Sequence, residues 1–405
     1  MRLPHDPQPG TFDFNPRTRV VFGPDTVDRV GGLAAEWNAR RVLLVTDPHI
    51  VEAGHAPRAQ RASEAAGQSV VVYDRVRENP TTEDVNACLA VARDANIDTI
   101  VGIGGGSSLD TAKGCNFLLT NGGKMSDYWG VGKAGKPMLP LIAVPTTAGT
   151  GSECQSFALI ADATTHQKMA CGDPKAAARV AILDPTLTVT QPRLVTADTG
   201  IDALTHAVET AVTRKRTELS AVFSREALRL IVRALPRVFE SPDDMDARGR
   251  MLLAAAYAGT AIENSMLGAA HAAANPLTAH FNIVHGQAVG LMLPTVVRFN
   301  ADDPATRLLY KDLAVGARLV APDVHPNDAV AALLDAIDRL LDAAQLPRTL
   351  VEHDVPREAV PALAQEAMAQ WTAQFNPRPL HQHDFEQLYE TVYDSAKEKL
   401  PASRG

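Results

Sequence analysis

The chain has 405 residues, 45% of them hydrophobic, which is enough for two domains with separate cores. Its formal net charge of −8 argues against nucleic acid or an anionic membrane surface as a partner. The opening residues lack the pattern of a signal peptide, and the sequence contains no run of about 18 apolar residues that could cross a membrane.

Strand-like and helix-like segments alternate through the first half of the chain. Apolar runs predict strands at residues 19–23, 41–47, 69–74 and 97–103. Helical patterns lie between these strands, at residues 25–38, in a stretch that ends near Gly67, and at residues 82–95. Alternation of this kind predicts a parallel sheet covered by helices on both faces.

The last residue of the second predicted strand, Asp47, bears on the choice of cofactor. A carboxylate at the carboxyl end of a parallel strand can accept hydrogen bonds from the hydroxyl groups of an adenosine ribose, and it repels a 2′-phosphate. Asp47 therefore favours NAD over NADP. The alternative is that Asp47 only caps the helix that begins after it at Pro48.

The fourth predicted strand runs directly into a glycine-rich loop and then into a helix at residues 109–119. Glycines let the backbone approach a ligand closely, and serine hydroxyls and helix amides can bind an anion. The loop is neither a Walker A motif nor the usual Rossmann fingerprint, because no Gly-Lys-Ser/Thr follows and position 109 is leucine. We expect it to hold a pyrophosphate through Gly104, Gly105, Gly106, Ser107 and Ser108.

A further apolar strand ends in a loop with similar chemistry. The segment PLIAVPTTAGTGSE places Thr146, Thr147, Thr150 and Ser152 after its strand, where they are additional hydroxyl and amide donors. The alternative for both loops is a pair of ordinary turns.

Strand signals stop after residues 179–185, and long patterns rich in alanine and leucine continue to Lys399. We place the change between Asp184 and Thr190. The sequence therefore predicts an α/β domain at residues 1–186 and an all-helical domain at residues 187–405.

Four residues of the second half have the types and spacings of a site for a divalent metal. Asp202 and His206 are four positions apart, so in a helix both side chains leave the same face. His271 lies in an alanine-rich helical pattern, and His285 precedes a glycine. Carboxylate and imidazole ligands suit Fe(II), Zn(II) or Mn(II). The alternative is that these are unrelated histidines in a chain that contains 12.

The four cysteines lie far apart without CxxC spacing, so they indicate neither a zinc knuckle nor a disulfide framework. A reducing compartment fits such cysteines, and we expect the protein in the cytoplasm. We also expect it to form a homodimer or a higher homo-oligomer.

Five segments together, GGGSSLDTAK, VPTTAGTGSE, DALTHAVE, GAAHAAANPL and HGQAVGLMLP, resemble the iron-containing (group III) alcohol dehydrogenase family. The similarity extends from about Phe14 to Leu388. It implies an α/β dinucleotide-binding domain and an all-helical domain in a dehydroquinate synthase-like architecture, with a catalytic metal in the cleft between them.

The resemblance also assigns roles to individual positions. Asp202, His206, His271 and His285 match the metal ligands of the family, and Asp110 joins residues 104–108 in its pyrophosphate loop. Further positions match residues that contact the cofactor: Asp47, Asn79, Thr146, Thr147 and Lys168. The chain departs from the family at Asn275, where a second histidine is common, and at Val284, where proline is usual. An amide cannot relay a proton as imidazole does, so Asn275 is only a weak catalytic candidate.

The expected activity is hydride transfer between NAD(H) and a small alcohol or aldehyde, with Fe(II) or another divalent ion polarising the substrate oxygen. Phe157, Met266 and Phe281 are candidates for an apolar substrate lining. A lyase resembling dehydroquinate synthase, which also uses NAD and a metal, is the alternative activity. A non-catalytic scaffold protein would need a broken ligand set or phosphate loop, and both are intact here.

Overall fold

The computed structural model describes residues 11–165 and 167–393, in which two compact units are distinguished by their internal contacts. An α/β unit comprises residues 15–199 and 237–263, and a helical unit comprises the other described residues. Three helices contribute residues to both units: α6 (Arg193–Thr210), α7 (Glu218–Glu240) and α8 (Met245–Ser265). The single boundary predicted after residue 186 stays a prediction. The opening residues and the helical pattern expected between residues 394 and 399 lie outside the described residues.

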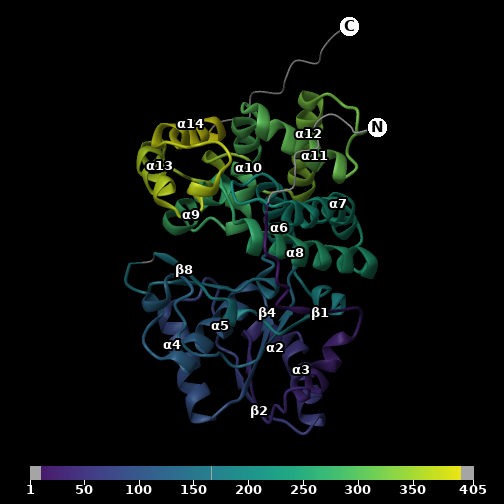
Figure 1. The fold of residues 1–405 in the computed structure, drawn as a ribbon, viewed down its shortest axis with the longest axis vertical. Helices are drawn as coiled ribbons and strands as arrows, with labels where there is room; N and C mark the ends of the chain where they lie inside the picture. Colours follow the sequence, from purple (N-terminus) through teal and green to yellow (C-terminus); the bar gives the residue numbers. More distant parts are fainter. Residues whose placement is uncertain (1–10, 166, 394–405) are drawn as a thin grey trace. The chain divides into compact units, whose positions relative to one another are not determined.

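A six-stranded parallel sheet forms the centre of the α/β unit (Figure 1). Its strand order is β1-β9-β6-β4-β2-β3, and every neighbouring pair is parallel. The strands are β1 (Arg19–Phe22), β2 (Arg41–Val45), β3 (Ser69–Tyr73), β4 (Thr99–Gly104), β6 (Leu141–Pro145) and β9 (Val180–Leu183). All residues of β4, β6 and β9 are buried, which explains their continuous apolar sequences.

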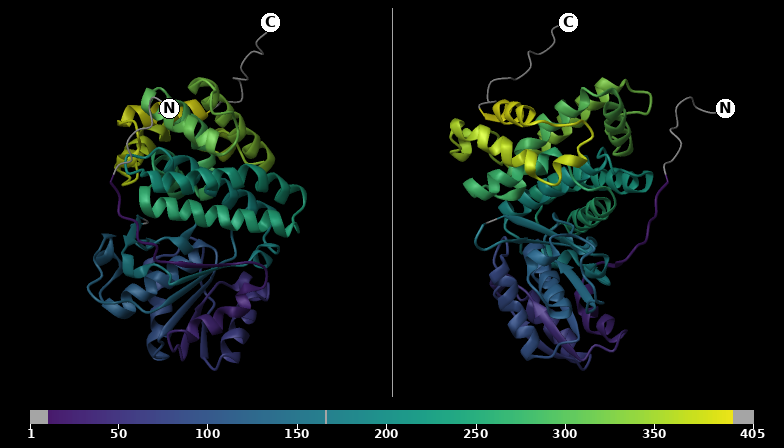
Figure 2. Two further views of the ribbon diagram at one scale, coloured as in Figure 1. Left: turned by 45° about the vertical axis from the view of Figure 1, so that its right-hand side comes forward. Right: turned by 60° about the vertical axis from the view of Figure 1, so that its left-hand side comes forward.

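Helices cover both faces of this sheet, because alternate residues of each strand point to opposite sides. In β2, Leu43 and Val45 belong to the core shared with α4 and α5, whereas Val42 and Leu44 belong to the core shared with α1 and α3. Figures 1 and 2 show these helices around the strands. The helices of this unit are α1 (Val30–Ala35), α2 (Pro48–Glu52), α3 (His55–Ala65), α4 (Thr82–Asp94) and α5 (Gly106–Asn121). The predicted layered α/β fold is confirmed.

The carboxyl ends of three neighbouring strands meet at one edge of the sheet. The register pairs Gly104 at the end of β4 with Pro145 at the end of β6, and β2 lies on the other side of β4. Asp47, the glycine-rich loop and the threonine-rich loop follow these three strands in turn. Parallel topology therefore brings all three predicted cofactor segments together.

A second, three-stranded sheet in the α/β unit was not predicted. It contains β5 (Gly130–Val131), β7 (Phe157–Ala161) and β8 (Lys168–Gly172) in the order β5-β8-β7, with β7 and β8 antiparallel. β5 has only two residues, and β8 begins with lysine and ends with glycine, so of the three strands only β7 is a continuous apolar run like those of the main sheet.

The helical unit has its own core, formed mainly by α9 (Ala269–Phe281) and α10 (His285–Ala301) with α13 (Val360–Ala369) and α14 (Gln382–Tyr393) (Figure 2). The remaining helices of the unit are α11 (Pro304–Gly316) and α12 (Pro326–Ala344). Short 3₁₀ turns complete the described chain: η1 (Thr26–Arg29), η2 (Met125–Tyr128), η3 (Ser152–Cys154), η4 (Pro174–Ala176), η5 (Pro185–Thr188), η6 (Val351–His353), η7 (Arg357–Ala359) and η8 (Ala373–Phe375). Within the described ranges, no helix combines the length and the apolar character needed to cross a membrane.

Candidate metal and cofactor sites

The glycine-rich loop places the start of α5 at the edge of the sheet. Gly105 is the N-cap residue, and no side chain caps the helix. The first amides of a helix have no partner within it, and the helix dipole favours negative charge at this end. The loop therefore has the geometry expected for a phosphate group.

Close packing in this loop requires glycine. Gly104 has φ of +147°, and a methyl group there would lie 2.4 Å from the Oγ atom of Ser108. A methyl group on Gly106 would lie 2.8 Å from Cγ2 of Thr150, so the two predicted loops touch. The amide of Thr146 also donates to the carbonyl of Gly104 at 3.0 Å.

Asp47 caps α2, which is one of the two alternatives that the sequence offered, and its contact with a cofactor ribose stays a prediction. One carboxylate oxygen, Oδ1, accepts hydrogen bonds from the amides of His49 (3.0 Å) and Ile50 (3.1 Å), so Asp47 caps α2. The other oxygen, Oδ2, lies 3.4 Å from Oγ of Ser108 in the glycine-rich loop. Asn79 lies beside the same loop, where its backbone amide donates to Oγ of Ser107 at 3.2 Å.

Asp110 lies in a buried polar network behind the loop. Its carboxylate accepts a hydrogen bond from Oγ of Ser152 at 2.8 Å. The Nζ atom of Lys113, which sequence reasoning missed, donates to the carbonyl (2.6 Å) and hydroxyl (2.8 Å) of Ser152 and to the carbonyl of Phe157 (2.9 Å). Burial raises the pKa of Asp110 and lowers the pKa of Lys113. The spacing Asp-x-x-Lys on one helix face was the available signal.

Three other predicted residues have less informative surroundings. Lys168 is the half-buried first residue of β8, opposite Ala161. Phe157 is buried in β7 and its ring packs against Gly172, so its side chain is part of the interior of the α/β unit. Phe281 packs against the core of the helical unit. Direct contacts of Asp110 and Lys168 with a cofactor, and of Phe157, Met266 and Phe281 with a substrate, stay predictions.

Glu153, next to this network, provides a test of the buried polar layer. Burial raises its pKa from 4.5 to about 7. The folded protein binds this proton more tightly than the unfolded chain does. The protonated carboxyl group therefore stabilises the fold below pH 4.5, and this contribution to the free energy of unfolding is lost as the pH rises through 7. We expect Glu153→Gln, which cannot ionise, to gain about 2 kcal/mol in free energy of unfolding relative to the wild type between pH 5 and pH 8. Urea unfolding at both pH values measures this, and parallel changes in both proteins would exclude a neutral buried carboxyl group.

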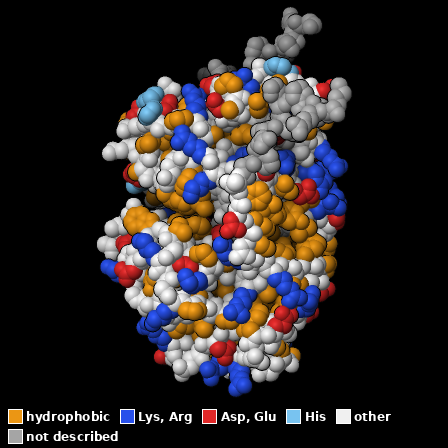
Figure 3. Space-filling model, in the orientation of Figure 1, with side chains coloured by type: hydrophobic (Ala, Val, Ile, Leu, Met, Phe, Trp, Pro, Cys, Tyr) orange, Lys and Arg blue, Asp and Glu red, His pale blue; other side chains and the backbone are white. Residues whose placement is uncertain are grey.

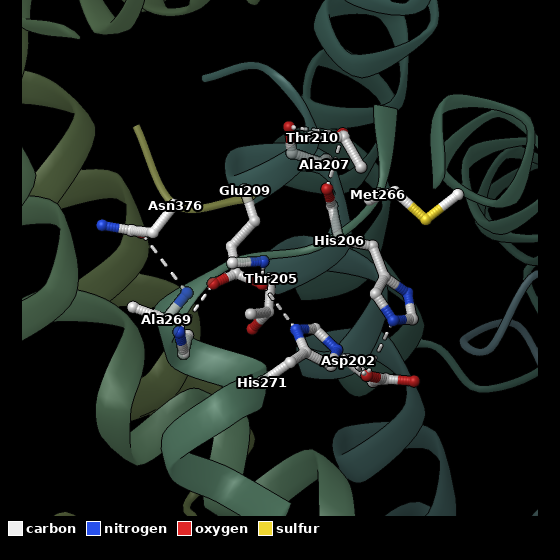
Figure 4. A network of polar contacts seen from close by, with 12 residues as sticks. Asp202, Thr205, His206, Ala207, Glu209, Thr210, Met266, Ala269, His271 and Asn376 are labelled. Carbon is white, nitrogen blue, oxygen red and sulfur yellow. Dashed lines mark hydrogen bonds and ion pairs between the residues drawn. The ribbon is translucent and has the colours of Figure 1, made fainter. Parts of the chain in front are cut away.

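The candidate metal ligands converge in the helical unit, and Figure 4 shows Asp202, His206 and His271 among them. The Oδ1 atom of Asp202 lies 3.3 Å from Nε2 of His206, 3.6 Å from Nε2 of His271 and 3.8 Å from Nε2 of His285. Tetrahedral coordination with bonds of about 2.1 Å separates ligand atoms by about 3.4 Å. The ligand atoms of Asp202, His271 and His285 all lie within 4.8 Å of one another, whereas His206 lies outside this group.

The potential ligand atoms of this cluster are arranged to bind a cation rather than to hydrogen-bond with one another. Oδ1 of Asp202 and Nε2 of His271 are buried without a hydrogen-bond partner. Burial would raise the pKa of Asp202, but His206, His271 and His285 hold it well below its usual range. Burial would lower the pKa of His271, but Glu209 and Asp202 raise it to about 9. The raised pKa means that His271 holds a proton whose positive charge balances the Asp202 carboxylate, and a bound cation would take the place of that charge.

Two positions at which the chain departs from the family have simple surroundings. Asn275, one turn after His271 in α9, is half-buried, and its Nδ2 atom donates to Oε1 of Gln370 at 3.0 Å. Val284 is the N-cap residue of α10, directly before His285. The amide of Asn275 is thus oriented by a second amide and has no titratable hydrogen-bond partner among those identified.

Comparison with known proteins identifies the class. Residues 16–185 match the model of iron-containing alcohol dehydrogenases, and residues 196–393 match the C-terminal model of the same family. The chain belongs to the iron-containing alcohol dehydrogenase family. It is accordingly an NAD-linked oxidoreductase of alcohols and aldehydes, in a family that depends on NAD and a metal, and this interpretation holds over the lyase alternative.

Named relatives agree with this class. Alcohol dehydrogenase 4 of Schizosaccharomyces pombe is 36% identical over 84% of this chain and 80% of its own length. NAD-dependent methanol dehydrogenase of Bacillus methanolicus is 33% identical over 91% of this chain and 96% of its own length. The crystal structure of a 1,3-propanediol oxidoreductase superposes with a TM-score of 0.91 at 30% identity, covering 95% of this chain and 100% of that one. The predicted dehydroquinate synthase-like architecture is confirmed.

Proposed function

We propose that Asp202, His206, His271 and His285 hold one divalent ion, and that this ion serves the oxidation of a small alcohol by NAD or the reverse reduction of an aldehyde. The observation that carries the proposal is the approach of three imidazole nitrogens to one buried carboxylate oxygen at 3.3, 3.6 and 3.8 Å. When bound, a divalent ion supplies Lewis acidity that lowers the pKa of an alcohol or polarises a carbonyl group. We propose Fe(II), after the family; Zn(II) and Mn(II) suit the same ligands.

The chain's own residues have distinct tasks in this proposal. The carboxylate of Asp202 and the neutral imidazoles bind and orient the ion. Residues 104–108 and Thr146, Thr147 and Thr150 bind the pyrophosphate of NAD through amides and hydroxyls. Asn275, held by Gln370, orients a substrate hydroxyl or a water molecule without exchanging its own proton.

A reconstitution experiment tests this function. The protein is stripped with a chelator and reloaded anaerobically with Fe(II), Zn(II) or Mn(II). The absorbance of NADH is then followed with a panel of primary alcohols, diols and hydroxy acids, and with the corresponding aldehydes. We expect turnover only in reloaded protein. Equal turnover in the stripped protein would contradict the metal assignment.

We also propose that Asp47 selects NAD over NADP. Asp47→Asn is the sharpest change, because an amide oxygen can still cap α2 while the negative charge facing Ser108 is lost. A charge-assisted hydrogen bond contributes about 1.5 to 3 kcal/mol, so we expect NAD affinity to fall roughly tenfold or more and NADP affinity to rise. Titrations with both cofactors measure this ratio. An unchanged ratio, or a wild type that already prefers NADP, would show that Asp47 does not face the ribose.

We also propose that the protein forms a homodimer or a higher homo-oligomer and that it is located in the cytoplasm. Val20 and Phe22 lie on the edge strand β1 with 46% and 45% of their surfaces exposed, and a second copy of the chain would cover them. Figure 3 shows that hydrophobic side chains also reach the surface elsewhere. All four cysteines are free thiols, which supports a reducing compartment such as the cytoplasm.

A further inference from the structure

Glu209 is a buried carboxylate on the same helix as Asp202 and His206. It lies seven residues after Asp202 and three after His206, so all three project from one side of α6. Glu209 is 4% exposed, and its only ion-pair partner among the described residues is His271. A buried charge without a lysine or arginine partner is costly unless several donors compensate it.

Three donors from one short segment meet this carboxylate (Figure 4). Its Oε2 atom accepts from Nδ1 of His271 at 2.6 Å and from the amide of Gly268 at 3.2 Å. Its Oε1 atom accepts from the amide of Ala270 at 2.6 Å. A carboxylate that accepts these bonds requires the hydrogen of His271 to be on Nδ1. In the neutral ring, Nε2 then has a free lone pair, and this is the atom that lies 3.6 Å from Asp202.

The same contacts fix the beginning of α9. Gly268 is the N-cap residue and supplies no side-chain cap. Glu209 binds the amides of Gly268 and Ala270 instead, and Oδ1 of Asn376 binds the amide of Ala269 at 3.3 Å. A methyl group on Gly268 would lie 3.1 Å from Oε1 of Glu209, so glycine permits this close approach. The helix turn that carries His271 is therefore attached to α6 by one carboxylate.

We propose that Glu209 is a positioning residue of the metal site, which fixes both the ring orientation and the tautomer of His271 for a cation bound at Asp202. The inference rests on the proposed metal site. When the residue that hydrogen-bonds a metal-ligating histidine is mutated, metal affinity commonly falls by about 10- to 100-fold. Glu209 meets that description and also joins the two helices that supply Asp202 and His271.

The variant Glu209→Gln separates this role from simple packing. The amide has nearly the same shape, but it has only one accepting oxygen for donors that now meet both carboxylate oxygens. If its NH₂ group faces His271, the ring must accept at Nδ1 and place its hydrogen on Nε2. We expect the affinity for Co(II), titrated into chelator-treated full-length protein, to fall by about 10- to 100-fold. We also expect the visible Co(II) absorption at saturation to change in shape.

Asn376→Ala is the matched control, because Asn376 caps the same helix turn without touching His271. We expect it to lower the thermal midpoint while the Co(II) affinity and spectrum stay unchanged. In a cycle with His271→Ala, the change Glu209→Gln should have no further effect on Co(II) affinity, since it acts through that ring. A methyl group on Gly268 would meet Oε1 of Glu209 at 3.1 Å and Oδ1 of Asn376 at 3.2 Å. If Asn376→Ala leaves Co(II) binding unchanged, weaker binding by Gly268→Ala is due to the displaced Glu209, and this variant decides the question if Glu209→Gln does not fold.

Two results would overturn the inference in different ways. Wild-type affinity and spectrum in folded Glu209→Gln, or in Gly268→Ala as the substitute, would reduce Glu209 to a helix cap. Failure of the wild-type chain to bind Co(II) at all would overturn the proposed metal site, and this inference with it.

Discussion

His271→Ala is expected to lose most of its bound metal and more than about 100-fold in turnover, because the substitution removes a buried residue that we propose as a ligand and whose Nε2 atom has no hydrogen-bond partner. The variant also leaves Glu209 with two backbone amides and no imidazole. Metal content by atomic emission and NADH production with a primary alcohol measure both losses. Affinity for NAD should change little, since the loops proposed to bind it consist of other residues.

A matched control lies on the same helix. His280 is half-exposed near the end of α9, where it pairs with Glu366 at 2.8 Å. His280→Ala removes an imidazole from α9 without touching the candidate ligands, so we expect wild-type metal content and turnover. Equal loss in both variants would point to a general effect on α9, and full activity of metal-free His271→Ala would remove the site assignment.

Gly104→Ala is expected to weaken NAD binding by about 100-fold. At φ of +147° an alanine is strained by about 1 to 3 kcal/mol, and its methyl group would lie 2.4 Å from Oγ and 2.8 Å from Cβ of Ser108. Relief of the contact moves Ser108 out of the turn that begins α5, and each charge-assisted hydrogen bond lost to a phosphate adds about 1.5 to 3 kcal/mol. Calorimetric titration with NAD measures the effect.

The control for Gly104 is a glycine with space around it. A methyl group on Gly32 in α1 meets nothing within 4 Å. Gly32→Ala should therefore bind NAD like the wild type and have equal or slightly greater stability, because alanine favours a helix. Wild-type NAD affinity in Gly104→Ala would show that the loop does not bind the pyrophosphate.

The main sheet could be predicted from sequence because its strands are buried on both faces. The segments that became β4, β6 and β9 are continuous apolar runs, and their alternation with helices allows few arrangements other than a parallel sheet. The small sheet of β5, β7 and β8 could not be found in this way. Strand β5 has only two residues and pairs with the distant β8, and β8 begins with lysine and ends with glycine, so only β7 is a continuous apolar run.

The candidate site was predictable where chemistry and spacing coincide in one segment. Asp202 and His206 are recognisable as a pair, and their proximity to His271 and His285 was suggested by residue type. Glu209 and Lys113 were missed because a glutamate or lysine in a helix is usually exposed to solvent. Only the tertiary structure shows that Glu209 meets the first turn of α9 and that Lys113 donates to Ser152.

The two hydrogen bonds that hold Asp47 to α2 have a consequence for cofactor binding. Two amides of α2 hold one oxygen of this carboxylate, so the side chain has already lost its rotational freedom when the chain folds. Its second oxygen can then accept a hydrogen bond without a further loss of side-chain entropy. If Asp47 binds the cofactor as we propose, its affinity is set in part by α2, a helix of five residues that itself contacts no ligand in the proposal. Changes in α2 should therefore alter cofactor binding even where the residues facing the cofactor are untouched.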